Sequence, residues 1–191
     1  MNCYSNCPWD SDPSGVSGWK YIGNRFEGGG INLRESCTNI LILGNTLKTI
    51  KMIGGDKIII IANKFISGGS GVTYATTVPT NVLVQQNDFI DASATVHADI
   101  LAEPTNIIRR NIGYTTENSG TATFSGDGTT TQFSIAHGLV STPTKVLVTP
   151  MSSDAASDFY VTADDTNIYI NYKSAPPSGT DNLKFSWYAE V

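Results

Sequence analysis

Charged side chains are scarce in this chain of 191 residues: 15% are Asp, Glu, Lys or Arg, and the formal net charge is −5. The 12 Lys and Arg residues form no cluster, whereas binding to a phosphate backbone requires several clustered cations. Nucleic acid is therefore not an expected partner. Long hydrophobic runs are also lacking, because the longest, residues 58–62, has only the length of a strand. The sequence thus predicts no insertion into a membrane.

Residues that hold metals or carry out chemistry are few. The three cysteines, Cys3, Cys7 and Cys37, have no metal-ligand spacing, and Cys3 and Cys7 either pair or stay reduced. No nucleophile elbow, phosphate loop or dinucleotide-binding glycine motif is present. We therefore expect no metal and no organic cofactor, and no motif supports an enzymatic function for this part of the protein by itself.

Short Val, Ile and Leu runs separated by Gly, Ser, Thr and Asn make up most of the chain. The 18 glycines and the polar residues between these runs indicate many short strands joined by turns. This texture predicts an all-β fold.

An internal repeat occupies the first half of the chain. Copies open at residues 17, 38, 56, 80 and 105, so one repeat takes 18 to 25 residues. In the first four copies an Asn lies seven places after the opening, and Phe or Leu follows two places later; these residues are Asn24, Asn45, Asn63 and Asn87. Because Asn tolerates left-handed backbone and its amide can bond to the next copy, we expect the four to form a ladder along stacked turns.

The second half has a different pattern. Its candidate strands, residues 121–125, 132–136, 145–150, 159–163, 167–172 and 183–189, are separated by turn signals such as Gly126-Asp127-Gly128. Several alternate between apolar and polar residues, so that one face is buried. We expect a small antiparallel sandwich.

The repeat closed by Asn-x-Phe/Leu resembles the right-handed parallel β-helices of pectate-lyase-like proteins and phage tailspikes. The second half, with Phe133-Ser-Ile-Ala-His137-Gly-Leu139 and the ending Phe185-Ser-Trp187-Tyr188-Ala189, looks like a small β-domain at the C-terminus of phage tail proteins. We therefore expect an N-terminal segment (1–16), a right-handed parallel β-helix of about five rungs (17–118) and a C-terminal β-sandwich (119–191) for trimerisation and capping.

Two apolar faces alternate along the repeat strands, and only one can point into the coil. Trp19, Tyr21 and the row containing Ile40, Ile58 and Val82 make up the first face, and we expect the two aromatic rings in the core. The second face holds Ile22, Leu41, Leu43, Ile59, Ile61, Leu83 and Ile108. It is too apolar to be left to water, so either the chain itself or identical copies must cover it. The resemblance implies a homotrimer with Leu41, Leu43, Ile59, Ile61 and Leu83 at its interface.

Candidate ligand-binding residues lie in the loops. Tyr74, on a Gly- and Ser-rich segment, could stack on a sugar ring, and Glu27 leads into a triple glycine. His97, with Asp99 two places later, could act as a base with its orienting carboxylate, although a solvated loop is the simpler explanation of both residues. Asp56 and Asp88 are more simply explained as turn residues.

The resemblance implies the distal part of a trimeric viral tail fibre or tailspike, located in the virion tail or extracellularly, that binds a host-surface polysaccharide or receptor. Two alternatives remain open on the sequence. One is a fragment of a polysaccharide depolymerase, a hydrolase or lyase whose active site lies on other rungs. The other is a cellular surface adhesin with the same fold.

Overall fold

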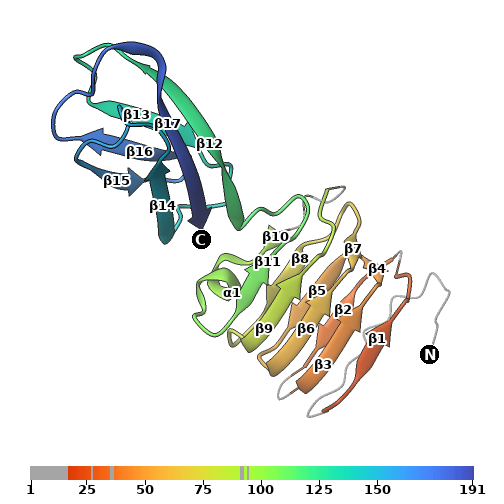
Figure 1. Cartoon of the computed structure of the whole chain (residues 1–191). Helices are drawn as coiled ribbons and strands as arrows, with labels where there is room; N and C mark the ends of the chain where they lie inside the picture. The colour runs from red at the N-terminus through yellow and green to blue at the C-terminus, as the bar shows by residue number, and fades with distance from the viewer. Residues whose placement is uncertain (1–16, 27, 35–36, 91–92, 94) are drawn as a thin grey trace. The chain divides into compact units, whose positions relative to one another are not determined.

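A computed structural model describes residues 17–26, 28–34, 37–90, 93 and 95–191 of the chain (Figure 1). The chain divides between Tyr114 and Thr115 into two compact units. The expected N-terminal segment, with Cys3 and Cys7, lies outside the described residues, and Cys37 is buried in the solenoid core. The predicted fold class, a parallel β-helix followed by antiparallel sheets, is confirmed.

The first unit is a parallel β-solenoid of about four turns. Its longest sheet stacks five parallel strands in the order β1 (Lys20–Ile22), β3 (Thr38–Leu43), β6 (Asp56–Ile61), β9 (Thr80–Gln85) and β11 (Ile107–Arg109). A second sheet contains β2 (Ile31–Leu33), β5 (Thr49–Met52), β8 (Gly71–Tyr74) and β10 (Thr95–Val96). The short third sheet pairs β4 (Thr46–Leu47) with β7 (Lys64–Phe65), and isolated bridges at Arg25, Asp88 and Ile112 extend it.

Inward-pointing side chains fill the coil. Ile40, Ile58 and Val82 stack in one row and Ile42, Ile60 and Val84 in the next, all at most 1% exposed. Tyr21 packs partly buried against this core, but the expectation for Trp19 was wrong, since it is 47% exposed. Trp19 precedes β1 in the first described coil, where the described chain supplies a neighbouring coil on one side only.

Left-handed backbone at both ends of the long-sheet strands turns the chain. Gly18, Asn39, Lys57 and Asn81 have positive φ at the openings, and Gly23, Gly44, Ala62, Gln86 and Arg110 have it at the ends. The second row lies one residue before each repeat Asn. The left-handed residue is therefore the one that precedes the Asn. The sequence had suggested that the Asn itself is left-handed.

The repeat asparagines are instead buried hydrogen-bonding residues, between 0% and 7% exposed for Asn24, Asn45, Asn63 and Asn87. Asn45, Asn63 and Asn87 each accept at the side-chain oxygen the backbone N–H and the amide N–H of the Asn one coil earlier; the Asn45 N–H reaches Asn63 Oδ1 at 2.9 Å and Asn45 Nδ2 reaches it at 3.0 Å. A fifth member, Asn111, receives the same two bonds from Asn87 at 3.0 and 3.1 Å. We call these five residues the Asn ladder. It satisfies buried polar groups that would otherwise oppose stacking.

Opposite substitutions in the left-handed row should have opposite effects. Ala62 has φ 53° and Gly44 has φ 63°, and apart from its two chain neighbours no residue has an atom within 4 Å of a Cβ built on Gly44. A left-handed non-glycine residue costs about 1–2 kcal/mol. We therefore expect Gly44→Ala to lower the free energy of unfolding by about 1 kcal/mol or more and Ala62→Gly to raise it or leave it unchanged, as measured by urea denaturation. A stabilising Gly44→Ala would contradict this account.

The last coil is covered by its own unit. After β10 the chain forms α1 (Ala98–Ala102), whose Ile100 is fully buried in the solenoid core. Phe65 and Phe89 stack inside the coil with ring centroids 4.5 Å apart, and Tyr114 follows at 5.9 Å from Phe89. The Tyr114 hydroxyl donates a hydrogen bond to the Val96 carbonyl at 3.0 Å. These residues close the apolar interior at the end of the described coils.

The second unit is a sandwich of two three-stranded antiparallel sheets. One contains β12 (Glu117–Gly126), β17 (Gly179–Glu190) and β14 (Lys145–Pro150), and the other contains β13 (Gln132–Ala136), β16 (Asn167–Tyr172) and β15 (Phe159–Ala163). Their facing side chains share one core, in which Phe124 contacts Phe133 and Phe159 contacts Phe185. His137 is a buried turn residue, because its Nδ1 accepts the Leu139 N–H at 3.0 Å and its Nε2 lies 3.1 Å from the Asp164 carbonyl.

Two turn carboxylates of the sandwich are hydrogen-bonded in their charged form. Asp127 accepts the N–H groups of Thr130 and Thr129, and Asp164 accepts those of Thr166 and Asn167 together with the Tyr169 hydroxyl. These bonds, led by the backbone bond from Thr130 in one turn and from Thr166 in the other, lower the pKa of each carboxyl well below its ordinary value of 3.8.

Because both pKa values are lower in the folded state than in the unfolded chain, their stabilisation is fully present above about pH 4. It is lost as the pH falls through the folded pKa values. We expect the urea concentration at the unfolding midpoint of the wild type to decrease as the pH is lowered below about 4. The decrease should be less steep in Asp127→Asn and Asp164→Asn. An identical pH profile in all three proteins would show that these turns contribute nothing.

Candidate functional site

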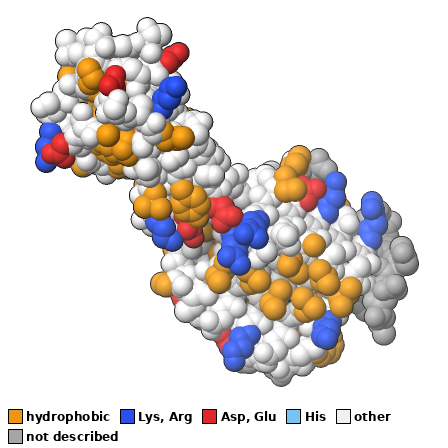
Figure 2. All heavy atoms as spheres, viewed as in Figure 1, with side chains coloured by type: hydrophobic (Ala, Val, Ile, Leu, Met, Phe, Trp, Pro, Cys, Tyr) orange, Lys and Arg blue, Asp and Glu red, His pale blue; other side chains and the backbone are white. Residues whose placement is uncertain are grey.

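The outward face of the long sheet carries a contiguous apolar surface. Strand register places the outward residues in two rows: Lys20, Leu41, Ile59, Leu83 and Ile107 in one, and Ile22, Leu43, Ile61, Gln85 and Arg109 in the other. We call the apolar members the outer stripe: Ile22, Leu41, Leu43, Ile59, Ile61, Leu83 and Ile107. Figure 2 shows hydrophobic side chains gathered over the solenoid, with Lys and Arg around them.

Exposure along the outer stripe is high for residues of this type. Ile22 is 46%, Ile59 41% and Ile107 50% exposed, and the four other members are partly exposed. Isolated exposed apolar residues are normal on soluble proteins, but a contiguous patch marks an interaction surface.

The outward-facing residue predicted for the last coil was wrong by one position. Ile108 is buried beside Val84, and Ile107 is the outward residue beside Leu83. The last copy aligns with the others when residues are counted back from its closing Asn111. It does not align when they are counted forward from Thr105. Consistently, the Val82 N–H donates to Asn106 Oδ1 at 2.8 Å, which places Asn106 opposite Val82.

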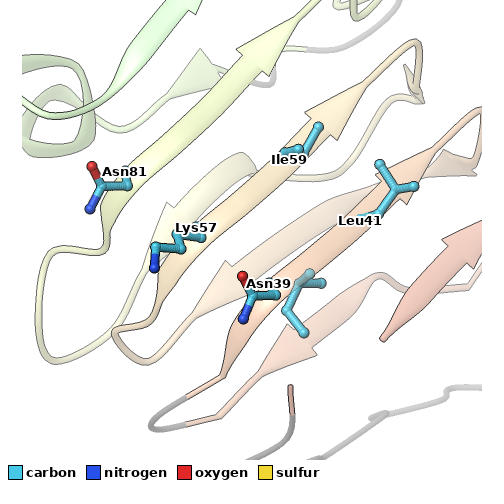
Figure 3. Close-up of a pocket in the computed structure, with 6 residues that line it drawn as sticks. Asn39, Leu41, Lys57, Ile59 and Asn81 are labelled. Atoms are coloured by element: carbon cyan, nitrogen blue, oxygen red, sulfur yellow. The ribbon is translucent and has the colours of Figure 1, made fainter. Parts of the chain in front are cut away.

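A groove runs along one side of the outer stripe, at the start of the strands. It has a volume of about 330 Å³ and is lined by Asn39, Ile40, Leu41, Lys57, Ile59 and Asn81. In Figure 3, Asn39, Lys57 and Asn81 lie at the same end of three neighbouring strands, and Leu41 and Ile59 lie further along them. The repeat pattern did not mark these polar residues as a site, although each directly follows a Thr or Asp that opens a repeat.

Asp56 has a structural role beside the groove, because it bonds to the groove residue Asn81. Its carboxylate accepts the Asn81 amide at 2.6 Å and the Thr80 hydroxyl at 3.1 Å. The hydrogen bond from Asn81 is the main cause that lowers the pKa of Asp56. Asp88 likewise bonds within its own turn, to the Ile90 N–H at 2.9 Å.

Three of the four predicted ligand-binding residues lie together on the solenoid. The Tyr74 hydroxyl donates to Asp99 Oδ2 at 2.5 Å, and the His97 ring lies edge-on to the Tyr74 ring with centroids 5.0 Å apart. His97 Nδ1 accepts the Asp99 N–H at 3.2 Å and lies 3.8 Å from Asp99 Oδ2. Glu27, the fourth predicted residue, lies outside the described residues.

The sequence had suggested that Tyr74 lies on a loop, but the structure places it in a strand. It is the last residue of β8, in register with Met52 of β5, and its ring packs half-buried against the solenoid core. The next coil turns into α1 after His97, which brings Asp99 over the Tyr74 hydroxyl. The hydrogen bond to Asp99, together with burial and the negative charge, raises the pKa of Tyr74 above its ordinary value.

The cluster of Tyr74, His97 and Asp99 holds one carboxylate. Glycoside hydrolysis generally needs two carboxylates on either side of a sugar. The cluster contributes the single carboxylate of Asp99, which already bonds to Tyr74, while Glu103 accepts the Thr105 hydroxyl at 3.0 Å in its own turn. The described residues contain no group of three or more His, Cys, Asp or Glu side chains placed to hold a metal ion. None of the helices in the described part of the chain is both long and apolar enough to span a bilayer.

Comparison with known proteins gives one similar structure. No family model matches the chain, and no curated protein matches it. The crystal structure of the tailspike protein gp49 from Pseudomonas phage LKA1 is similar over 94% of this chain and 45% of that chain, with a TM-score of 0.39 and 11% sequence identity. The chain therefore spans a little under half the length of that tailspike.

Proposed function

We propose that this chain is the distal part of a trimeric viral tail fibre or tailspike that binds glycan on the host surface. The observation that carries the proposal is the outer stripe, an apolar face on the outside of an already filled β-solenoid. The resemblance of the Asn-x-Phe/Leu repeat to tailspike β-helices supports the viral context, and the sandwich after the solenoid supports a distal position.

The outer stripe supports assembly from identical chains. Its members lie in two rows along the stacking direction. Three copies around an axis parallel to this direction would therefore bring equivalent rows together. Burying this apolar area in each copy would favour association by roughly 25 cal/mol per Å² removed from water. Within the same proposal Leu41, Leu43, Ile59, Ile61 and Leu83 form the trimer contact.

The cluster of Tyr74, His97 and Asp99 would bind sugar and not cleave it. An aromatic ring beside an imidazole and a carboxylate offers an apolar surface with donors and acceptors at its edge, which suits a pyranose ring. The single carboxylate argues for binding over glycoside hydrolysis at this cluster.

Two measurements test the proposal. Sedimentation at micromolar concentration should give the mass of three chains. Incubation with purified host lipopolysaccharide or capsule should give stable binding without new reducing ends or unsaturated uronates. A monomeric protein would contradict the fibre proposal. New reducing ends or unsaturated uronates would show that the chain is an enzyme.

A further inference from the structure

The outer face of the β13–β16–β15 sheet presents an ordered polar surface in the C-terminal unit. Strand pairing aligns Gln132, Asn171 and Tyr160 in one row across the three strands and Ser134, Tyr169 and Thr162 in the next. We call these six residues the sandwich platform. Their neighbours along each strand point into the core, where Ile168, Ile170 and Tyr172 are at most 5% exposed.

We propose that the sandwich platform binds a neutral oligosaccharide. This inference rests on the proposed function and adds a second glycan site to it, on a different unit from the cluster around Tyr74. It also assigns the ligand class, an uncharged sugar chain.

Absence of charge from the six platform residues selects the ligand class. Three of the charged groups next to the platform are engaged: Asp158 and Lys173 form an ion pair of 2.6 Å in the adjoining row, and Asp164 accepts the Tyr169 hydroxyl at 2.7 Å. Asp165 adds a further negative charge near Tyr169, which disfavours an anionic ligand. An anionic sugar would find no unpaired cation among the platform residues. Hydroxyl groups of a neutral sugar would instead meet amides and hydroxyls, which both donate and accept.

Hydrogen bonds between the platform side chains hold them in place. Gln132 Nε2 donates to Asn171 Oδ1 at 2.8 Å, and Asn171 Nδ2 donates to Thr162 Oγ1 at 3.2 Å and to the Tyr169 carbonyl at 3.3 Å. A side chain ordered before binding loses less entropy when the ligand arrives. These bonds use both hydrogens of the Asn171 amide, so the capacity left for a ligand is the second Nε2 hydrogen and the oxygen of Gln132 and a second lone pair on Asn171 Oδ1.

Tyr160 supplies the apolar part of the platform. It is 58% exposed, although it lies on a strand whose neighbouring residues pack into the sandwich. Tyr combines a rigid ring with few rotatable bonds, so it gives a large contact area at low entropic cost. The row from Gln132 to Tyr160 spans two strand spacings, roughly 10 Å, which is enough for a short oligosaccharide lying across the strands.

Array binding with the full-length protein tests the site. The probes are immobilised neutral oligosaccharides of glucose, galactose, mannose and N-acetylhexosamines, alongside sialylated and uronic-acid glycans. We expect binding to at least one neutral class in preference to the charged glycans. Tyr160→Ala should weaken that binding roughly tenfold or more, and Tyr160→Trp should restore it. Leu147→Ala is the matched control, because Leu147 is 61% exposed on β14 in the other sheet.

The outcomes separate this site from the proposed function. Neutral-glycan binding that depends on Tyr160 supports the platform, even if the chain is monomeric and the fibre proposal fails. Binding that is unchanged in Tyr160→Ala, or no binding to any neutral class, overturns the platform, even if the protein is a trimer that attaches to host polysaccharide. A thermal melt of each variant guards against misfolding, and Tyr160→Ala should melt like the wild type because the ring is exposed.

Discussion

Ile59→Asp should convert the proposed trimer into monomers or aggregates. Ile59 lies at the centre of the outer stripe, in register between Leu41 and Leu83. If three copies meet there, the substitution places three carboxylates close together in a dry contact. Burying unpaired charge of this kind costs several kcal/mol per trimer.

Light scattering at micromolar concentration measures the effect. Thr76→Asp is the control, because Thr76 is exposed and lies outside the long sheet, and this variant should remain trimeric. A trimer that survives Ile59→Asp would show that the sandwich alone holds the copies together and that the outer stripe is covered by its own chain. Circular dichroism of the monomeric variant should retain the β-sheet spectrum, since Ile59 points away from the coil interior.

Asn63→Ala should cost about 3 kcal/mol or more of unfolding free energy. Asn63 accepts two N–H groups of Asn45 at 2.9 and 3.0 Å, and its amide donates to the carbonyls of Ile42 and Ile61 at 2.9 and 3.1 Å. Alanine would leave several of these buried groups unpaired, and each unpaired group costs about 1–3 kcal/mol. The middle of the Asn ladder should therefore be among the most sensitive positions of the solenoid.

Urea denaturation tests this, with Lys64→Ala as the neighbouring control. Lys64 is exposed beside Asn63, so its substitution should change the midpoint little. Asn111→Ala, at the end of the Asn ladder, should cost less than Asn63→Ala because no further member of the ladder is described beyond it. Equal midpoints for wild type and Asn63→Ala would mean that the ladder does not stabilise the fold.

The candidate sites were predictable to different degrees. His97 and Asp99 are two residues apart in sequence, but their contact with Tyr74 depends on β10 giving way to α1 in the last coil, which no local pattern in the sequence indicates. The groove residues Asn39, Lys57 and Asn81 are equivalent in the repeat, yet nothing in their residue types marks them as a row. The sandwich platform joins Gln132 with Asn171 and Tyr160, residues that only antiparallel pairing makes neighbours.

By itself, the sequence determined the stacking of the coils. A buried Asn at each turn and Phe or Leu two places later fix both the alignment of successive coils and the inward face, because a buried amide must find the same partner in every coil. Only the tertiary structure decided the register of the last coil, where counting from Thr105 placed Ile108 outside and counting from Asn111 buries it. A one-residue shift moves every side chain of a strand to the other face, and hydrogen bonds to the preceding coil, not local preference, select the register.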